Sequence, residues 1–220
     1  MHKARKFINT GIEKLHKAYL AKLRDPKTRD NIRKNLKKTL NLDKQAQLEG
    51  GQTTQYSRIR KRYNFFEHQK EISTHLKELL KTKKTIYVLD AGAGDGSILV
   101  SLKQLCNGQA HTTAMDLIKT PQLEQRLKTG QIDRIIKRSL EGFTPDREYD
   151  LIVSYFGALY YVTTSLKAHY GELLARSLAK GGKLVIYPYR RELEQFKDQR
   201  FRLEINYRGR DSSAIVTRIK

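Results

Sequence analysis

The sequence predicts an α/β fold: a doubly wound, mostly parallel sheet that ends in an antiparallel C-terminal hairpin strand, with a basic helical extension at the N-terminus. Three observations support this. After residue 64, strand and helix patterns alternate, which is typical of a parallel sheet covered on both faces. Two strand patterns near the C-terminus are separated by a short polar segment, so they form a hairpin. Basic residues are concentrated in residues 1–62.

The extension, residues 1–55, has the pattern of two amphipathic basic helices. Apolar residues recur at steps of three and four from Ile8 to Leu23. Asp25-Pro26 ends this helix and begins another, because Asp is a good N-cap and Pro suits the first helical position. Gly50-Gly51 and the polar residues after it indicate a linker. We expect residues 56–220 to form the main domain, on which the extension either packs as a cap or projects for binding.

The main domain reads as a helix followed by alternating strands and helices. The expected helices are about 64–81, Ser97–Leu105, Pro121–Lys128 and Ser165–Ala179, the last one ended by Gly181-Gly182. The expected strands are Thr85–Asp90, His111–Asp116, Arg134–Arg138, Tyr149–Tyr155, Lys183–Tyr187, Arg202–Tyr207 and Ala214–Ile219. This order predicts a parallel sheet closed by a C-terminal hairpin.

The composition restricts the classes of function. The 220 residues include 44 Lys and Arg against 23 Asp and Glu, a net charge of +21, and residues 1–62 alone hold 18 basic and 5 acidic residues. Such an excess predicts attraction to a polyanion, either nucleic acid or an anionic membrane surface. The single cysteine, Cys106, excludes an intrachain disulfide and argues against a structural zinc cluster, so we interpret it as packing and expect no metal.

The sequence carries weak signals about location. It has no run of about 18 apolar residues, so we expect no transmembrane helix. The N-terminus lacks the apolar core of a secretory signal. A cytoplasmic protein is therefore expected; a mitochondrial presequence is the alternative for the basic N-terminus. The oligomeric state is not predicted.

A glycine-rich loop, Ala91–Gly96, follows the first predicted strand and precedes a helix. Glycines allow a tight turn and a close approach of the backbone to a ligand, at the edge where open α/β sheets bind ligands. A dinucleotide fingerprint would place its third glycine at position 97, which is Ser97. The carboxylate of Asp90 would also repel a pyrophosphate. S-adenosylmethionine (SAM), with its ammonium and sulfonium, fits better, and Asp116 can accept hydrogen bonds from both ribose hydroxyls.

Here the sequence resembles the class I, seven-stranded, Rossmann-like SAM-dependent methyltransferases. The matching segments are 88–96, Asp116, 149–154 and 178–184, and the resemblance covers about residues 64–220. It implies an enzyme that transfers a methyl group from SAM. The SAM-binding residues that it implies are Asp90, Gly92 and Gly94 at the methionine end with Ala93 and Gly96 in the same loop, Asp116 and the following Leu117 at the ribose, Ser139 and Leu140 beside the adenine, and Ser154 beside the methyl group. Glu141 is the alternative adenine contact.

The catalytic residues are not identified by the sequence. Methyl transfer needs mainly orientation and a dry, shaped site, so a general base is optional. The candidates are Ser154 and Tyr155 after the fourth strand, and Tyr63 and His68 before the first strand. His68 is either a base that titrates near neutrality or a surface or capping residue.

The methyl acceptor is the least determined feature. Segment 154–161 lacks the Asn/Asp-Pro-Pro-aromatic motif of adenine- and glutamine-type N-methyltransferases, which disfavours that subclass. Its Tyr160 and Tyr161 either contact a flat or cationic acceptor or pack in the core or a lid. We favour RNA (rRNA or tRNA) as acceptor, with residues 1–55 and Arg58–Arg62 contacting phosphates.

Two alternatives stay open. One is a small-molecule or protein methyltransferase whose N-terminus is a cap or an anchor to an anionic surface. The other is a non-catalytic subunit with a SAM-binding fold that binds nucleic acid; the intact glycine loop and Asp116 argue against it.

Overall fold

The structure is a computed structural model, and it describes residues 69–117, 119–155, 157–161, 164–189, 191, 193–194, 196, 198–208 and 211–220. The predicted extension at residues 1–55 and the candidate residues Tyr63 and His68 lie outside these ranges. The boundary between the extension and the main domain therefore stays a prediction.

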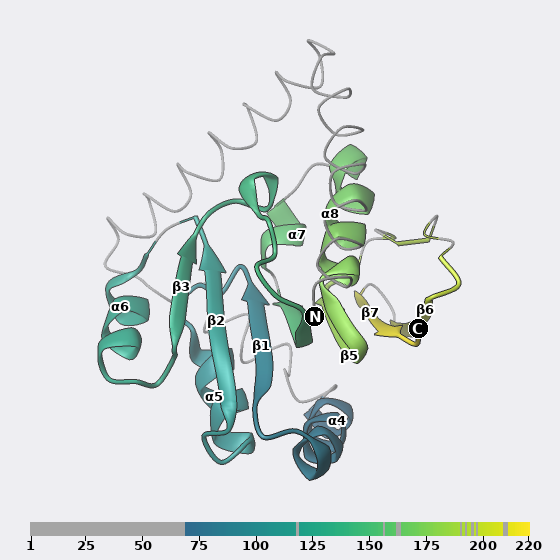
Figure 1. The fold of residues 1–220 in the computed structure, drawn as a ribbon. Helices are drawn as coiled ribbons and strands as arrows, with labels where there is room; N and C mark the ends of the chain where they lie inside the picture. Colours follow the sequence, from purple (N-terminus) through teal and green to yellow (C-terminus); the bar gives the residue numbers. More distant parts are fainter. Residues whose placement is uncertain are drawn as a thin grey trace.

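Seven strands form one sheet in the described part of the chain (Figure 1). Their order in the sheet is β3-β2-β1-β4-β5-β7-β6. The strands are β1 (Ile86–Ala91), β2 (Ala110–Asp116), β3 (Arg134–Lys137), β4 (Tyr149–Tyr155), β5 (Leu178–Tyr187), β6 (Phe201–Arg208) and β7 (Asp211–Arg218). Strands β1 to β5 pair in parallel, whereas β7 runs antiparallel to both β5 and β6. The predicted sheet and its closing hairpin are confirmed.

Helices cover both faces of this sheet (Figure 1). They are α4 (Gln69–Thr82), α5 (Ser97–Leu105), α6 (Pro121–Lys128), the 3-10 helix η2 (Leu140–Gly142), α7 (Ala158–Tyr161) and α8 (Thr164–Arg176). Buried side chains of α4, α5 and α6 join one core cluster, and those of α7 and α8 join the other. The doubly wound arrangement is thus confirmed. Within the described ranges, no helix is long and apolar enough to cross a membrane.

The centre of the sheet is the most deeply buried part of the structure. Every residue of β4 is buried, and five of the six residues of β1 are buried. Strands covered on both faces need a nearly continuous apolar sequence, so β1 and β4 could be predicted from their apolar residues. The rigid pair β1–β4 carries the loops at the carboxyl edge, where ligands are expected.

Some predicted boundaries near the C-terminus are wrong. The strand expected at Ala214–Ile219 spans Asp211–Arg218, so it begins three residues earlier. The helix expected at Ser165–Ala179 ends at Arg176, and β5 already begins at Leu178. Gly181 and Gly182 therefore lie inside β5 and do not end a helix. Tyr149 pairs with Leu178, but Leu151 pairs with Lys183, so the residues between them bulge out of the ladder.

The two glycines have a local reason to lie in this bulge. Gly181 has a φ of 78°, in the left-handed region. A Cβ atom built on Gly182 would come within 2.8 Å of the Tyr149 carbonyl oxygen. The close approach of β5 to the start of β4 excludes a side chain there.

Candidate functional site

The glycine loop is tied to the end of β2 by backbone hydrogen bonds. The N–H groups of Gly92 and Ala93 donate to the carbonyl oxygen of Met115, at 2.8 and 3.2 Å. The N–H of Gly94 donates to the Asp116 carboxylate at 2.8 Å. Because β1 and β2 are parallel, their carboxyl ends share one edge, and the two predicted parts of the SAM site come together there.

The three glycines of the loop adopt conformations that other residues rarely adopt. Gly92, Gly94 and Gly96 have φ values of 96°, 55° and 74°. At Gly96, a Cβ atom would also come within 2.7 Å of the Leu123 side chain of α6. These positions explain the glycine spacing that the sequence shows, and they bring the start of α5 close to the edge of the sheet.

Asp90 is buried with an unpaired carboxyl group at the carboxyl end of β1. Its side chain is 1% exposed. Neither carboxylate oxygen has a hydrogen-bond partner among the described residues. Burying an unpaired carboxylate is costly, so such groups persist mainly where a partner binds or where function needs them.

The surroundings of Asp90 disfavour its negative charge. Burial raises the pKa of this carboxyl group well above its usual value, and the nearby carboxylates of Asp116 and Asp95 raise it further. A cation placed beside Asp90 would act in the opposite direction and stabilise the carboxylate.

The segment after β4 packs directly against the glycine loop. A Cβ atom on Gly157 would lie 2.1 Å from the Ala91 carbonyl oxygen, and one on Gly92 would lie 2.2 Å from the Ala158 nitrogen. The hydroxyl of Ser154, which is 1% exposed, donates to the same Ala91 carbonyl at 3.3 Å. Ser154 thus lies beside the loop with its hydroxyl hydrogen-bonded to the backbone, and its position beside the methyl group stays a prediction.

Tyr155, the second catalytic candidate on β4, projects from the opposite face of the sheet to Ser154. Its ring contacts that of Tyr187, the last residue of β5, with a centroid separation of 5.5 Å and an interplanar angle of 33°. The two residues are register partners, and they are 7% and 9% exposed. Both belong to the core cluster that contains Ala93 of the glycine loop.

The residues expected beside the adenine lie near the end of β2. The N–H of Arg138 donates to the backbone carbonyl of Asp116 at 3.0 Å. Ser139 is the N-cap of η2, and Leu140 is 3% exposed in a cluster with Met115. Leu117 directly follows β2 and is half-buried. No hydrogen bond is described between these side chains and the glycine loop, so their contact with SAM stays a prediction.

The remaining residues singled out in the sequence either make structural contacts or have side chains that are not described. The side chains of Tyr160 and Tyr161 are not described. Asp150 is buried, accepts a hydrogen bond from the Tyr87 N–H at 2.9 Å and forms an ion pair with Lys83. Cys106 is fully buried, as a packing residue should be. In the described part of the chain, no group of three or more His, Cys, Asp or Glu is placed to hold a metal ion.

Two site residues escaped the sequence interpretation. Gly157 was seen only as part of an aromatic run, and Tyr187 only as the end of a strand. The signal for Gly157 was a lone glycine directly after a buried strand, where a close backbone approach is common. Nothing local in the sequence indicates the contact between Tyr155 and Tyr187, because it depends on the register between β4 and β5.

Several solved structures with this fold are methyltransferases, and they differ in substrate. A magnesium protoporphyrin IX methyltransferase from Synechocystis, solved with bound SAM, is 17% identical, with 81% of this chain and 91% of that chain covered and a TM-score of 0.54. The 1,6-didemethyltoxoflavin-N1-methyltransferase from Burkholderia thailandensis, solved with S-adenosylhomocysteine, is 14% identical, with coverage of 75% and 84% and a TM-score of 0.52. A TehB-like SAM-dependent methyltransferase from Corynebacterium glutamicum is 20% identical, with coverage of 68% and 88% and a TM-score of 0.51.

Sequence comparison adds no closer relative: no protein-family model and no curated protein matches this chain. The structural likeness shows that the chain has the Rossmann-like fold of the class I SAM-dependent methyltransferases, which confirms the predicted fold.

Proposed function

We propose that this protein is a SAM-dependent methyltransferase and that its acceptor is RNA. The observation that supports the methyltransferase assignment is the position of Asp90. Its carboxyl group is buried without a described hydrogen-bond partner, at the carboxyl end of the strand that precedes the glycine loop. A cationic ligand is the partner that this environment lacks.

SAM fits the residues present. Its cationic methionine end would be held by Asp90 and by the backbone of Gly92 and Gly94, which have no side chains to obstruct it. Its ribose would be held by Asp116, a carboxylate at the end of the neighbouring strand. Leu140, buried near the end of β2, would supply apolar contact to the adenine. The solved neighbours with bound SAM or S-adenosylhomocysteine support this assignment.

When bound, SAM supplies an electrophilic methyl carbon attached to a sulfonium. The chain would orient the two reactants and exclude water from the site, which is what such an in-line transfer mainly requires. Asp90 would hold the cationic end, and the packing of Gly157 on Ala91 brings the segment after β4 against the loop. Ser154 would border the reacting region, whereas Tyr155 packs in the core on the other face of the sheet. No described residue has to act as a base if the acceptor is a ring nitrogen of an RNA base with a free lone pair, because such a nitrogen becomes positively charged on methylation and loses no proton.

RNA is proposed as acceptor because of charge. The chain carries +21, and residues 1–62 contain 18 basic residues against 5 acidic ones. A methyltransferase for a small neutral acceptor has no use for such an excess, whereas phosphate binding by Lys and Arg supplies most of the affinity for nucleic acid.

The test is a transfer assay with tritiated SAM against total RNA, total protein and a small-metabolite fraction. We expect label in RNA, no label with Asp90→Ala, and normal labelling with Glu78→Ala, which removes an exposed carboxylate of α4. Replacing Arg58, Arg60 and Arg62 by Ala should weaken RNA labelling and leave SAM affinity unchanged. Label only in metabolites would overturn the RNA assignment, and label in no fraction together with no SAM binding would overturn the enzyme assignment.

A further inference from the structure

One side of helix α6 packs against the second half of the glycine loop. The hydroxyl of Thr120, the residue just before this helix, donates a hydrogen bond to the Gly94 carbonyl at 3.3 Å. A Cβ atom on Gly96 would come within 2.7 Å of the Leu123 side chain. These two contacts and a third at Arg126 recur every three residues, so they lie on the same side of the helix. The loop is thus supported by the helix after β2 as well as by β2 itself.

The third contact is an ion pair between Arg126 and Asp95. Arg126 Nη2 lies 3.5 Å from Asp95 Oδ2, and Asp95 Oδ1 accepts a hydrogen bond from the Ser97 N–H at 3.0 Å. The Asp95 carboxylate therefore links the first residue of α5 to α6. The two paired side chains are 23% and 28% exposed, and a partly exposed pair contributes little to overall stability. Its main effect is expected on the local geometry of the loop.

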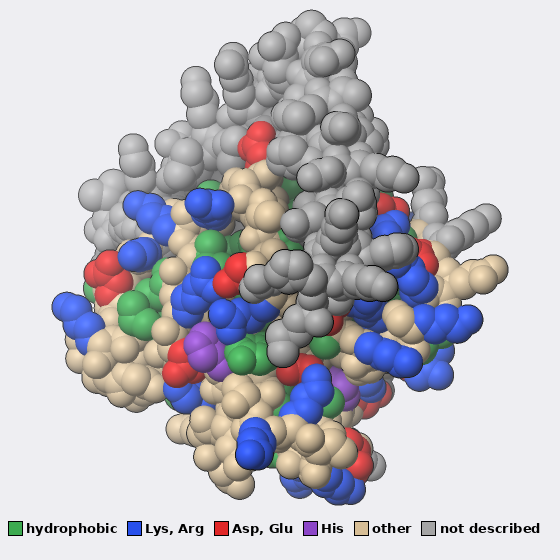
Figure 2. Space-filling model, viewed as in Figure 1, with side chains coloured by type: hydrophobic (Ala, Val, Ile, Leu, Met, Phe, Trp, Pro, Cys, Tyr) green, Lys and Arg blue, Asp and Glu red, His purple; other side chains and the backbone are tan. Residues whose placement is uncertain are grey.

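The other side of α6 faces solvent. Glu124 and Lys128 are exposed there. Figure 2 shows acidic and basic side chains over α6, at the left of the molecule. The side of α6 that carries Leu123, which is fully buried, is therefore the one that can act on the glycine loop.

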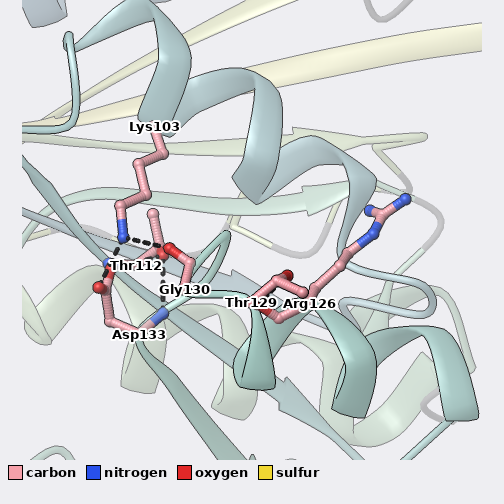
Figure 3. A network of polar contacts seen from close by, with 6 residues as sticks. All are labelled: Lys103, Thr112, Arg126, Thr129, Gly130 and Asp133. Carbon is pink, nitrogen blue, oxygen red and sulfur yellow. Dashed lines mark hydrogen bonds and ion pairs between the residues drawn. The ribbon is translucent and has the colours of Figure 1, made fainter.

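The far end of α6 is held at a second place. Lys103 of α5 donates a hydrogen bond to the carbonyl of Gly130, just after α6, at 3.0 Å, and the same Nζ lies 2.6 Å from the Asp133 carboxylate (Figure 3). Because α5 begins at the end of the glycine loop, the loop and the two helices form one closed unit. A change at the contact between α6 and the loop is therefore expected to alter the loop and not to release the whole helix.

Gly94 is the residue through which α6 would affect the cofactor. Its N–H donates to the Asp116 carboxylate at 2.8 Å, and its carbonyl accepts the hydrogen bond from Thr120. In the proposed function, the backbone of Gly94 contacts the methionine end of SAM and Asp116 contacts the ribose. Loss of the contacts with α6 would move Gly94 relative to Asp90, which lies in the buried strand β1.

We propose that Thr120 and Arg126 are positioning residues for SAM, which act by holding residues 94–96 of the glycine loop against α6. The proposal rests on the proposed function and extends it by two residues that act through the loop. A loop that is already in its binding conformation loses little conformational freedom when the ligand binds, and this increases affinity. SAM and its product S-adenosylhomocysteine share the methionine end and the ribose, so both should depend on this loop to the same extent.

A direct effect of charge predicts a different result. Arg126 is a cation near a site expected to bind a cationic ligand, so its removal would strengthen SAM binding if charge alone mattered. S-adenosylhomocysteine lacks the positive sulfonium, so its affinity would change less. Measuring both ligands therefore separates positioning from charge.

The test is calorimetric titration of SAM and of S-adenosylhomocysteine into full-length variants, at a temperature well below their melting temperatures. Arg126→Gln should weaken the binding of both ligands about threefold, and Arg126→Lys, which keeps the charge, should restore part of the affinity. Lys128→Gln, an exposed replacement in the same last turn of α6, is the matched control and should bind both ligands like the wild type.

A double-mutant cycle tests whether Arg126 acts through Asp95. Asp95→Asn keeps an acceptor for the Ser97 N–H but removes the ion pair. The cycle uses S-adenosylhomocysteine, whose net charge is zero, so that the change in charge has little direct effect on the ligand. Asp95→Asn/Arg126→Gln should bind it no more weakly than the weaker of the two single variants.

Thr120 gives a second and independent test. Thr120→Val removes the hydroxyl at nearly constant volume and should weaken the binding of both ligands about threefold, whereas Thr120→Ser should bind like the wild type. The Thr120 hydroxyl also caps α6 by accepting a hydrogen bond from the Leu123 N–H at 3.1 Å, so Thr120→Val should lower the melting temperature. Arg126→Gln should leave the melting temperature almost unchanged, which separates the effect on affinity from the stability of the helix.

The outcomes separate this proposal from the function on which it rests. Wild-type affinity for both ligands in Arg126→Gln or in Thr120→Val, or an additive loss in the double variant, overturns the positioning role while the wild type still binds SAM. Tighter binding of SAM alone by Arg126→Gln shows an effect of charge and also overturns it. Failure of the wild type to bind SAM overturns the proposed function itself.

Discussion

Gly157 and Ala91 lie so close that a Cβ atom on Gly157 would come within 2.1 Å of the Ala91 carbonyl oxygen. Two segments that are 66 residues apart in the chain thus meet backbone to backbone where β1 and β4 end. The shape of the glycine loop depends on the segment after β4 as well as on its own glycines.

Gly157→Ala should therefore disturb the site. The added methyl group has no room, so either the segment after β4 or the loop has to shift, at a cost of about 1–3 kcal/mol in unfolding free energy. SAM affinity, measured by calorimetry, should fall about tenfold or more, because the loop binds through backbone positions. Gly142→Ala is the matched control: its Cβ atom would meet only the Arg138 side chain, at an ordinary 3.9 Å. Equal SAM affinity in both variants would contradict the coupling.

Asp90→Asn should weaken ligand binding and stabilise the ligand-free protein. An acid whose pKa is raised in the folded state contributes stability at low pH and loses it as the pH rises through that raised pKa. The ligand-free Asn variant should thus gain in melting temperature over the wild type as the pH rises from about 4. Glu78→Gln, an exposed replacement, should show no such trend.

The same substitution predicts a pH effect on binding. A cation needs the carboxylate form of Asp90, so wild-type affinity for SAM should increase with pH, and the increase should stop above the raised pKa. Asp90→Asn should bind SAM weakly at every pH. An affinity of the wild type that is independent of pH, together with unimpaired binding by the variant, would show that Asp90 does not face the ligand.

A polar network behind the site should contribute stability. The Asp133 carboxylate accepts hydrogen bonds from the N–H and hydroxyl of Thr112, at 2.8 and 2.9 Å, and from Lys103 of α5 at 2.6 Å (Figure 3). Lys103 also donates to the Gly130 carbonyl at 3.0 Å. The network therefore connects α5, β2 and the start of β3.

Asp133→Asn should lower the unfolding free energy by about 1–2 kcal/mol near neutral pH, after allowance for solvent screening. Burial raises the pKa of Asp133, but the hydrogen bonds from Lys103 and Thr112 outweigh burial and hold it below its usual value. A carboxyl group whose pKa is lowered in the folded state stabilises the protein above its unfolded-state pKa and loses this contribution as the pH falls. The difference in unfolding free energy between the wild type and Asp133→Asn should therefore shrink below about pH 4. Urea unfolding of both proteins at several pH values measures this difference in unfolding free energy. The exposed pair Arg134–Asp146 is the control, and Asp146→Asn should change stability by about 0.5 kcal/mol or less.

The sequence was most informative where structure is local. The run from Ile86 to Asp90, the glycines after it and the following helix predicted β1, the loop and α5 correctly, because apolar runs and glycine turns act within a few residues. The hairpin was predicted for the same reason. The helix expected to end at Ala179 was wrong because Gly181-Gly182 looked like a helix end, whereas the pairing of β5 with β4 requires glycine there.

The parts of the site that the sequence did not reveal depend on contacts between distant strands. The packing of Gly157 on Ala91 and the Tyr155–Tyr187 pair exist only once β4 lies between β1 and β5.

Calorimetric titration of SAM into the wild-type protein and into Asp90→Asn tests the central claim most directly. We expect one saturable site per chain in the wild type and a loss of about tenfold or more in affinity in the variant, with both proteins folded. The absence of saturable binding to the wild type, or equal affinity in the two proteins, would contradict a SAM site at the carboxyl end of β1.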